Sequence, residues 1–225
     1  MSDPPALAGA AWLVAPDSRR LLAALAADGR ESRFVGGCVR DTLLDPAAGP
    51  RDLDVATQQP PERAAELLEA AGFRVIPTGL AHGTVTALGP EHRYEVTTLR
   101  RDVATDGRHA EVAFTDDFAA DAARRDFTIN AMSCDGRGRV HDCFGGLADL
   151  AAGRIRFVGE PALRIREDYL RILRWFRFFA RFGREPPDAA ALAACAAEAG
   201  GIDILSGERL RAELLLLLAL QRAPR

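Results

Sequence analysis

The chain has 225 residues, a formal net charge of −3 and 48% hydrophobic residues, enough for a buried core in one large domain or two small ones. All 29 basic residues are arginine, so a Schiff-base lysine and a P-loop lysine are both excluded. The overall charge gives no indication of a nucleic-acid partner, and only the local distribution of charge can do so.

The cysteines and the apolar stretches indicate the compartment. Four cysteines lie far apart and form no CxxC pair, which favours buried reduced thiols over a zinc site or a redox site; they are Cys38, Cys134, Cys143 and Cys195. No basic segment followed by an apolar run is present at the N-terminus. The longest apolar stretch, 214–220, is too short to cross a bilayer. We therefore predict a soluble cytoplasmic protein with no membrane partner.

The first part of the chain contains a helix and a short strand. Residues 1–16 are rich in proline and alanine and are predicted to lack order. Asp17 is placed to cap a helix that runs to Ala27. Residues 32–35 form a short predicted strand, which leads into a pair of glycines.

The glycine pair and two aspartates follow this strand. Gly36-Gly37 allows the backbone to approach a ligand and turn its amides towards phosphate oxygens. Arg40 follows on a helical turn, where its guanidinium can bind the same anion. Asp52 and Asp54 share one face of a predicted strand, because side chains two positions apart point the same way. Two adjacent carboxylates suit a cation such as Mg²⁺, although an isolated DxD is also typical of turns and solvated strand edges.

Short strands and a charged segment come next. A helix is predicted from Pro60-Pro61 to Ala71, and strands are predicted at 73–76, 84–88 and 94–99. In the last of these strands Glu95 is either a third carboxylate on the metal face or an exposed strand residue. Residues 100–117 carry many charges and are predicted to form a flexible loop, and His92 and His109 are predicted to be solvated loop residues.

A second polar motif lies at 124–132, RRDFTINAM. Arg125 and Asp126 place a donor beside an acceptor for phosphate or ribose, and Asn130 adds an amide. The structural alternative is an ion pair at a strand entrance. A short helix at 147–151 and a short strand at 155–159 are predicted to follow, and the composition then becomes helical, so we place a domain boundary near residue 150.

An arginine-rich stretch follows this boundary. Residues at helical spacing form one predicted stripe, namely Asp168, Arg171, Arg174, Arg177, Arg181 and Arg184. Asp168 accepts hydrogen bonds and Arg171 donates them, an order that complements the Watson–Crick edges of cytosine and adenine. Guanine and uracil present the reverse order, and each opposed polar group would cost ~1–3 kcal/mol. The alternative is a solvated helix face.

The chain ends with two further predicted helices. An alanine-rich helix is predicted at 189–199, and Ser206 is placed to cap a final helix through Leu220. Within the final helix, Glu208-Arg209 and Glu213 occupy one charged surface.

These motifs resemble, in order over residues 30–215, the class II tRNA nucleotidyltransferase and bacterial poly(A) polymerase family of the DNA polymerase β-like superfamily. The resemblance is carried by GGCVRD at 36–41, DLD at 52–54, RRDFTINAM at 124–132, EDxxRxxRxxRF from Glu167 and ERLxxEL from Glu208. It implies an α+β fold, with a polymerase β-like head of a small mixed sheet flanked by helices in residues 1–150 and an all-α neck in residues 151–225.

The resemblance also implies features around the site. The family has a mobile loop at 100–117, where Asp106-Gly107-Arg108 partly matches its pattern. The last motif is expected to buttress the selecting helix, although a salt-bridged helix surface is an equally good interpretation. The family's C-terminal tRNA-binding helices are expected to be absent from this chain.

By the same resemblance, each site residue has an expected role. Asp52 and Asp54 are the catalytic residues and bind Mg²⁺. The nucleotide is bound by Gly36, Gly37, Arg40, Arg125, Asp126, Asn130, Asp168, Arg171, Arg174 and Arg177.

The predicted function is template-independent addition of C and A, from CTP and ATP, to the 3′ end of tRNA. The RNA 3′-hydroxyl would attack the α-phosphate and pyrophosphate would leave. CCA addition is favoured because the 100–117 loop is present and the selecting pair fits both bases. Poly(A) synthesis uses the same motifs and stays open. A non-catalytic nucleotide- or RNA-binding module is the alternative of another class, against which the intact Asp52 and Asp54 argue.

Overall fold

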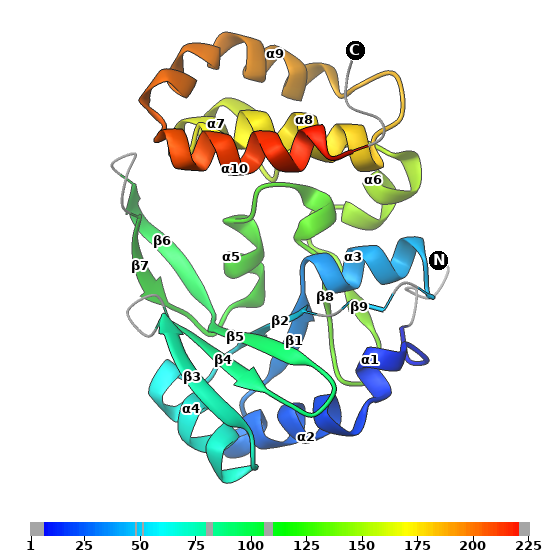
Figure 1. Cartoon of the computed structure of the whole chain (residues 1–225), viewed down its shortest axis with the longest axis vertical. Coiled ribbons are helices and arrows are strands. Elements are labelled where there is room, and N and C mark those ends of the chain that lie inside the picture. The colour runs from blue at the N-terminus through cyan, green and yellow to red at the C-terminus, as the bar shows by residue number, and fades with distance from the viewer. Residues whose placement is uncertain (1–6, 48, 51, 80–82, 106–109, 221–225) are drawn as a thin grey trace. The chain divides into compact units, whose positions relative to one another are not determined.

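The computed structural model describes residues 7–47, 49–50, 52–79, 83–105 and 110–220 (Figure 1). The chain divides into two compact units whose segments alternate along the sequence. The first contains Met1–Arg101, Val112–Ala122 and Asn130–Cys143, and the second contains Asp102–Glu111, Ala123–Ile129 and Phe144–Arg225. Within the described residues, no helix combines the length and the apolar character needed to span a bilayer.

A mixed sheet forms the centre of the first unit. The described residues give seven strands in the order β3-β4-β5-β2-β1-β8-β9. Their bounds are β1 Ser32–Val35, β2 Asp52–Thr57, β3 Arg74–Gly79, β4 Thr84–Leu88, β5 Arg93–Thr98, β8 Ser133–Cys134 and β9 Val140–His141. β2 and β5 are parallel, whereas the other neighbouring strands are antiparallel. This mixed sheet with flanking helices confirms the predicted fold class.

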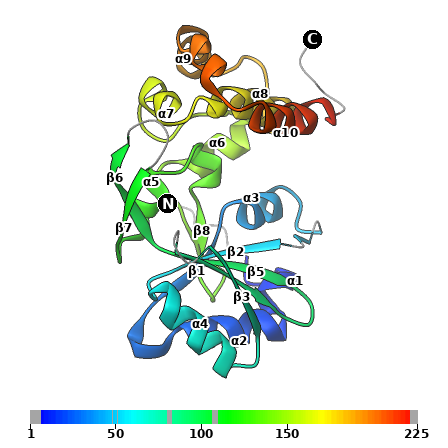
Figure 2. The same cartoon turned by 60° about the vertical axis from the view of Figure 1, so that its left-hand side comes forward.

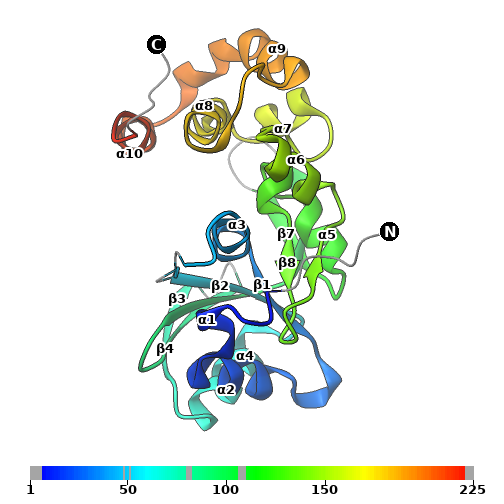
Figure 3. The same ribbon diagram turned by 90° about the vertical axis from the view of Figure 1, so that its right-hand side faces the viewer.

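Helices cover both faces of this sheet. Their bounds are α1 Ala11–Val14, α2 Pro16–Leu25, the 3₁₀ turn η1 Ala27–Gly29, α3 Gly37–Leu44, α4 Pro61–Ala70 and α5 Phe118–Ala123. Figures 2 and 3 show α3 on one face of the sheet and α2 and α4 on the other. Fully buried side chains fill the α2–α4 side, among them Leu21, Leu25, Leu53, Leu68 and Tyr94.

The N-terminal predictions were partly wrong. Residues 1–6 lie outside the described residues, but Trp12 is 2% exposed, donates to Thr42 Oγ1 at 2.8 Å and packs edge-on against Phe34. α2 begins at Pro16, and Asp17 is a buried residue of its first turn rather than its cap. The prediction of disorder rested on composition alone. Composition does not show that Trp12 packs against Phe34 of β1, and this contact orders the segment.

The predicted flexible loop at 100–117 was also wrong for most of its length. β6 Arg100–Thr105 and β7 Ala110–Phe114 form a separate two-stranded sheet among the described residues. Charged residues dominate this segment and obscure the β-branched residues between them, which favour strands. Asp106-Gly107-Arg108 and His109 lie outside the described residues.

The second unit is largely helical. Its bounds are the 3₁₀ turn η3 Thr128–Asn130, shared with the first unit, α6 Gly146–Ala152, α7 Pro161–Glu167, α8 Leu170–Phe182, α9 Ala189–Ala197, η4 Ala199–Ile204 and α10 Gly207–Leu218. A single bridge between Phe127 and Phe157 replaces the strand predicted at 155–159. Phe127 packs against Phe157 and Phe178 with ring centroids 5.1 and 5.0 Å apart, and these rings form the core beneath α8. α10 packs along α8.

The predicted arginine stripe is interrupted. α7 ends at Glu167 and α8 begins at Leu170, and Asp168 between them has an extended backbone with φ −159° and ψ 103°. Arg184 lies beyond the end of α8. The spacing of charged residues continues across the break, so a pattern based on spacing could not reveal it.

Candidate functional site

An acidic face lies on the central strands of the sheet. Asp52 and Asp54 are exposed on β2, whereas Leu53 and Val55 between and after them are 0% and 1% exposed. The parallel register places Asp54 opposite Glu95 of β5. Asp52, Asp54 and Glu95 therefore share one face, because paired residues of neighbouring strands point the same way. The shared face of the two aspartates is as predicted.

This acidic face is the one on which α3 lies. Tyr94, the register partner of Leu53, shares a hydrogen bond of 2.8 Å with Ser18 Oγ of α2. The side chains of Leu53 and Tyr94 thus face α2, and the alternating carboxylates face the opposite side, where Figures 2 and 3 show α3. A face that offers carboxylate oxygens alone suits a hard divalent metal ion.

The glycine pair begins α3. Gly36 has φ 70° and ψ −125°, a conformation that favours glycine. α3 starts at Gly37 with no side-chain cap among the described residues, and the amides at such a helix start suit an anion. Cys38 in the first turn is beside the backbone of Asp54. Burial raises the pKa of the Cys38 thiol to about 12, and the charge of Asp54 adds to this, so the thiol stays protonated.

Arg40 and Asn130 are brought together within the first unit. Arg40 is 6% exposed, and its guanidinium donates to Asn130 Oδ1 and to Asp41 Oδ1, the latter at 2.8 Å. Asn130 is 8% exposed. This contact joins the first and second predicted motifs directly, so Arg40 holds Asn130 in place. The predicted contact of Arg40 with a triphosphate stays a prediction.

Asp126 and Arg174 meet within the second unit. Arg174 Nε and Nη2 donate to Asp126 Oδ2 at 3.0 and 2.5 Å, and Asp126 Oδ1 accepts from the Phe127 amide. Burial opposes the charged form of Arg174, but the charge and hydrogen bond of Asp126 outweigh it and raise the pKa of Arg174. The neighbouring Arg125 is half-buried. Asp126 is therefore in an ion pair, but its partner is Arg174 of α8 and a 3₁₀ turn follows it, so the pair is not the one at a strand entrance that the motif alone suggested.

Asp168 and Arg171 are each held by other groups. Asp168 Oδ1 accepts from the Leu170 amide at 3.2 Å, and Oδ2 accepts from Arg209 Nη2 at 2.8 Å. Arg171 Nη1 donates to Glu167 Oε2 at 2.6 Å and to the Arg164 carbonyl at 2.8 Å. Both polar groups of the predicted base-selecting pair are thus fixed by the protein.

The last motif contacts this region at two points. Arg209 of α10 donates to Asp168, and Glu213 of α10 accepts from Arg177 Nε at 2.5 Å. Arg177 also lies over the ring of Phe178, 4.7 Å from its centroid. These ion pairs fit both the buttressing interpretation and a salt-bridged helix surface, so the role of the motif stays a prediction. Sequence spacing had not shown which residues Arg209 and Glu213 would meet.

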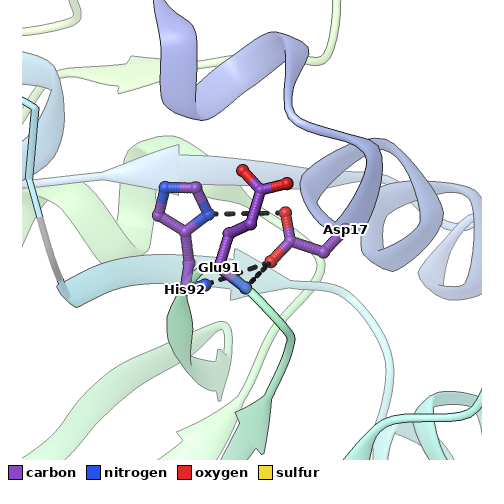
Figure 4. Close-up of side chains that lie close together, drawn as sticks. All are labelled: Asp17, Glu91 and His92. Carbon is purple, nitrogen blue, oxygen red and sulfur yellow. Dashed lines mark hydrogen bonds and ion pairs between the residues drawn. The ribbon is translucent and has the colours of Figure 1, made fainter.

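A group of potential metal ligands lies elsewhere in the first unit. Among the described residues, Asp17, Glu91 and His92 have ligand atoms within 4.8 Å of one another (Figure 4). Asp17 accepts from the amides of Ser18, Glu91 and His92 at 3.0, 3.3 and 3.1 Å, and His92 Nδ1 lies 3.4 Å from it. Asp17 therefore ties α2 to the turn between β4 and β5, and His92 is not the solvated residue that was predicted.

Three cysteines are buried as predicted, and one is not. Burial raises the pKa of Cys134 and Cys195 to about 12, as it does for Cys38. Cys143 is exposed, which contradicts the prediction for that residue. It lies outside strands and helices, where its burial could not be read from a pattern.

Comparisons with known proteins converge on one family. A protein-family model described as the poly A polymerase head domain matches residues 32–156 of this chain. The mouse (Mus musculus) mitochondrial CCA tRNA nucleotidyltransferase 1 is 48% identical over 196 residues, covering 86% of this chain and 45% of the relative. The chain thus spans about half the length of the curated relatives it matches.

Solved structures give the same result. The Bacillus stearothermophilus CCA-adding enzyme in complex with CTP has a TM-score of 0.80 at 33% identity, covering 93% of this chain and 50% of that one. The Thermotoga maritima CCA-adding enzyme complexed with tRNA_CCA has a TM-score of 0.78 at 27% identity, covering 98% and 52%.

Proposed function

The chain belongs to the poly A polymerase head-domain family, and from this membership we propose that it is a template-independent nucleotidyltransferase that adds C and A to the 3′ end of tRNA. The observation that carries the proposal is the exposed pair Asp52 and Asp54 beside the glycine start of α3. Two solved relatives are named CCA-adding enzymes, one in complex with CTP and the other with tRNA_CCA, and these relatives support CCA addition over poly(A) synthesis.

The proposed reaction is an in-line displacement at phosphorus. The 3′-oxygen of the RNA forms a bond to the α-phosphorus of CTP or ATP, the bond to the bridging oxygen breaks, and pyrophosphate leaves as the hydroxyl proton is released. Asp52 and Asp54 would hold Mg²⁺, and the register of Glu95 opposite Asp54 supports it as a third carboxylate. When bound, Mg²⁺ would supply stabilisation of negative charge on the phosphoryl oxygens.

The nucleotide's phosphates and ribose would be bound by groups from the first two motifs. The amides at Gly36, Gly37 and the start of α3 are suited to phosphate oxygens. Arg40 and Arg125 would add positive charge, and Asn130, held by Arg40, would present an amide. Asp126 would act through Arg174, whose guanidinium it holds.

The base would be selected by Asp168 and Arg171. Each side chain is fixed before the nucleotide arrives, so little side-chain entropy is lost on binding. Their acceptor and donor groups match cytosine and adenine, and guanine or uracil would leave opposed polar groups that cost ~1–3 kcal/mol each. Arg177, held by Glu213, would support the arrangement.

The proposal divides these roles along the sequence. Residues 1–150 would form the catalytic head and residues 151–225 the nucleotide-selecting neck. A cytoplasmic location belongs to the same proposal, although the mouse relative is mitochondrial by name.

The test is incorporation of each labelled nucleoside triphosphate, with Mg²⁺, into tRNA that ends before CCA or before the final A. We expect C, C and then A to be added and addition to stop there. Asp52→Asn should reduce the rate at least a hundredfold, on the order of the loss for one electrostatic transition-state group, while nucleotide affinity changes little.

Glu69→Gln is the matched control, because Glu69 is an exposed carboxylate on α4, on the other face of the sheet. Its activity should equal that of the unchanged chain. Open-ended addition of A would instead identify a poly(A) polymerase. A chain that binds nucleotides but incorporates none, and whose nucleotide binding Asp52→Asn does not change, would be a non-catalytic binding module.

A further inference from the structure

The turn between α7 and α8 fixes the position of the proposed base-selecting acid. Asp168 has an extended backbone and Tyr169 is the first residue with helical angles, φ −62° and ψ −17°. The Asp168 carbonyl accepts from the Arg171 amide at 3.0 Å. A movement of Tyr169 would therefore move both Asp168, its neighbour, and the first turn of α8 that carries Arg171.

Gly201 of η4 lies directly against the ring of Tyr169. A Cβ atom on Gly201 would be 2.0 Å from both Cδ1 and Cε1 of that ring, far inside any ordinary contact. Gly201 is not among the residues with positive φ. The backbone conformation thus does not require glycine here, and the requirement comes from the space that the tyrosine ring occupies.

Gly201 is part of a segment that is tied to α7. Its amide donates to the Glu198 carbonyl at 3.0 Å, and the Glu198 carboxylate accepts from Arg166 Nε of α7 at 2.8 Å. These contacts connect the segment that carries Gly201 to α7. Added bulk at Gly201 would have to displace the tyrosine ring.

We propose that Tyr169 is a positioning residue that sets nucleotide preference through its contact with Gly201. The inference rests on the proposed base-selecting role of Asp168 and Arg171. The ring of Tyr169 contacts the α7–α8 turn from one side, and Arg209 holds the Asp168 carboxylate by a hydrogen bond of 2.8 Å. Hydrogen-bond discrimination between bases depends on placement to within a fraction of an ångström, so displacement of this turn weakens it.

The test is the substitution Gly201→Ala in the 225-residue chain, with dissociation constants for CTP, ATP, GTP and UTP measured by equilibrium dialysis. We expect the ratio of the dissociation constants of GTP and UTP to those of CTP and ATP to fall about tenfold or more. A displacement of ~1 Å in a binding geometry can cost up to a hundredfold. Gly200→Ala is the matched control, because a Cβ there meets nothing within 4 Å. It should keep the preference of the unchanged chain.

Removal of the ring gives a second, independent measurement. Tyr169→Ala adds no bulk and should also narrow the preference, and adding Gly201→Ala to it should have no further effect because the clash is gone. A Gly201→Ala or Tyr169→Ala variant with a lowered melting temperature but an unchanged preference would show a merely structural contact and overturn the inference. Equal affinity of the unchanged chain for all four nucleotides would instead overturn the base-selecting role itself, and the inference with it.

Discussion

Asp17 illustrates how one side chain can serve a distant part of the chain. It is 2% exposed, and its carboxylate accepts hydrogen bonds from the amides of Glu91 and His92. A Cβ on Gly89 in the same turn would lie 2.6 Å from Asp17 Oδ2, so the carboxylate fills the space that this glycine leaves. The sequence placed Asp17 at a helix start but could not show that its acceptor capacity is used more than 70 positions away.

The pH dependence of stability should reflect this carboxylate. Burial would raise the pKa of Asp17, but hydrogen bonds from Tyr94, His92 and the Glu91 amide lower it below 3.8. A lowered folded-state pKa means that the stabilisation is present at pH values above the ordinary pKa of an aspartate and is lost as the pH falls through the lower folded-state pKa. We expect the urea midpoint to fall steeply below pH 3.8, and less steeply in Asp17→Asn.

The control for loss of one charge is Asp203→Asn, at an exposed position of η4. It should show the same pH profile as the unchanged chain. An Asp17→Asn variant whose midpoint falls as steeply as that of the unchanged chain would remove Asp17 from the explanation.

At the scale of elements, α10 is joined to α8 by an ion pair whose carboxylate is buried. Glu213 is 5% exposed and accepts from Arg177 of α8. Glu213→Gln would leave the partly buried Arg177 charge without its ionic partner, and breaking a pair of this kind costs about 3 kcal/mol, the lower end of the range for buried pairs. We expect the free energy of unfolding, measured in urea, to fall by about that amount.

Glu208→Gln on the same helix is the matched comparison, since Glu208 is exposed. A change of less than about 0.5 kcal/mol is expected there. Equal effects of the two substitutions would mean that the α8–α10 ion pair contributes no stability.

Elements with a strong local pattern could be predicted from the sequence. The predicted bounds of β1 and β4 agree with the structure, because short runs of β-branched and apolar residues end at turn residues. The break at Asp168 could not be predicted, since its carboxylate is bound by Arg209, 41 positions further on. β6 and β7 were missed because their charged residues resemble a solvated loop.

At the scale of the whole molecule, ligand binding should report on the proposed site. A ligand that binds only the folded state stabilises it by about 2.7 kcal/mol at a hundred times its dissociation constant. With Mg²⁺ present, CTP and ATP are expected to raise the melting temperature, and GTP and UTP at equal concentration to raise it less. If all four nucleotides raised the melting temperature equally in a calorimetric scan, this would contradict base selection by Asp168 and Arg171.

The candidate site was predictable to the extent that its residues are near one another in sequence. The alternation of Asp52 and Asp54 with Leu53 and Val55 follows from strand geometry alone. The Arg40–Asn130 contact spans 90 positions and depends on how α3 meets η3, which no local pattern contains. The sequence motifs identified the residues of the candidate site, whereas the fold determines which of these residues contact one another.

The parallel pairing of β2 with β5 has a consequence for how the chain acquires its acidic face during synthesis. Asp54 and Glu95 meet only when a segment of roughly 40 residues, with α4, β3 and β4 inside it, has closed into a loop. Non-local pairings of this kind form slowly compared with helices. A ribosome-bound chain would therefore expose Asp52 and Asp54 before β5 exists to fix them, and the complete acidic face would arise only after β5 has left the exit tunnel.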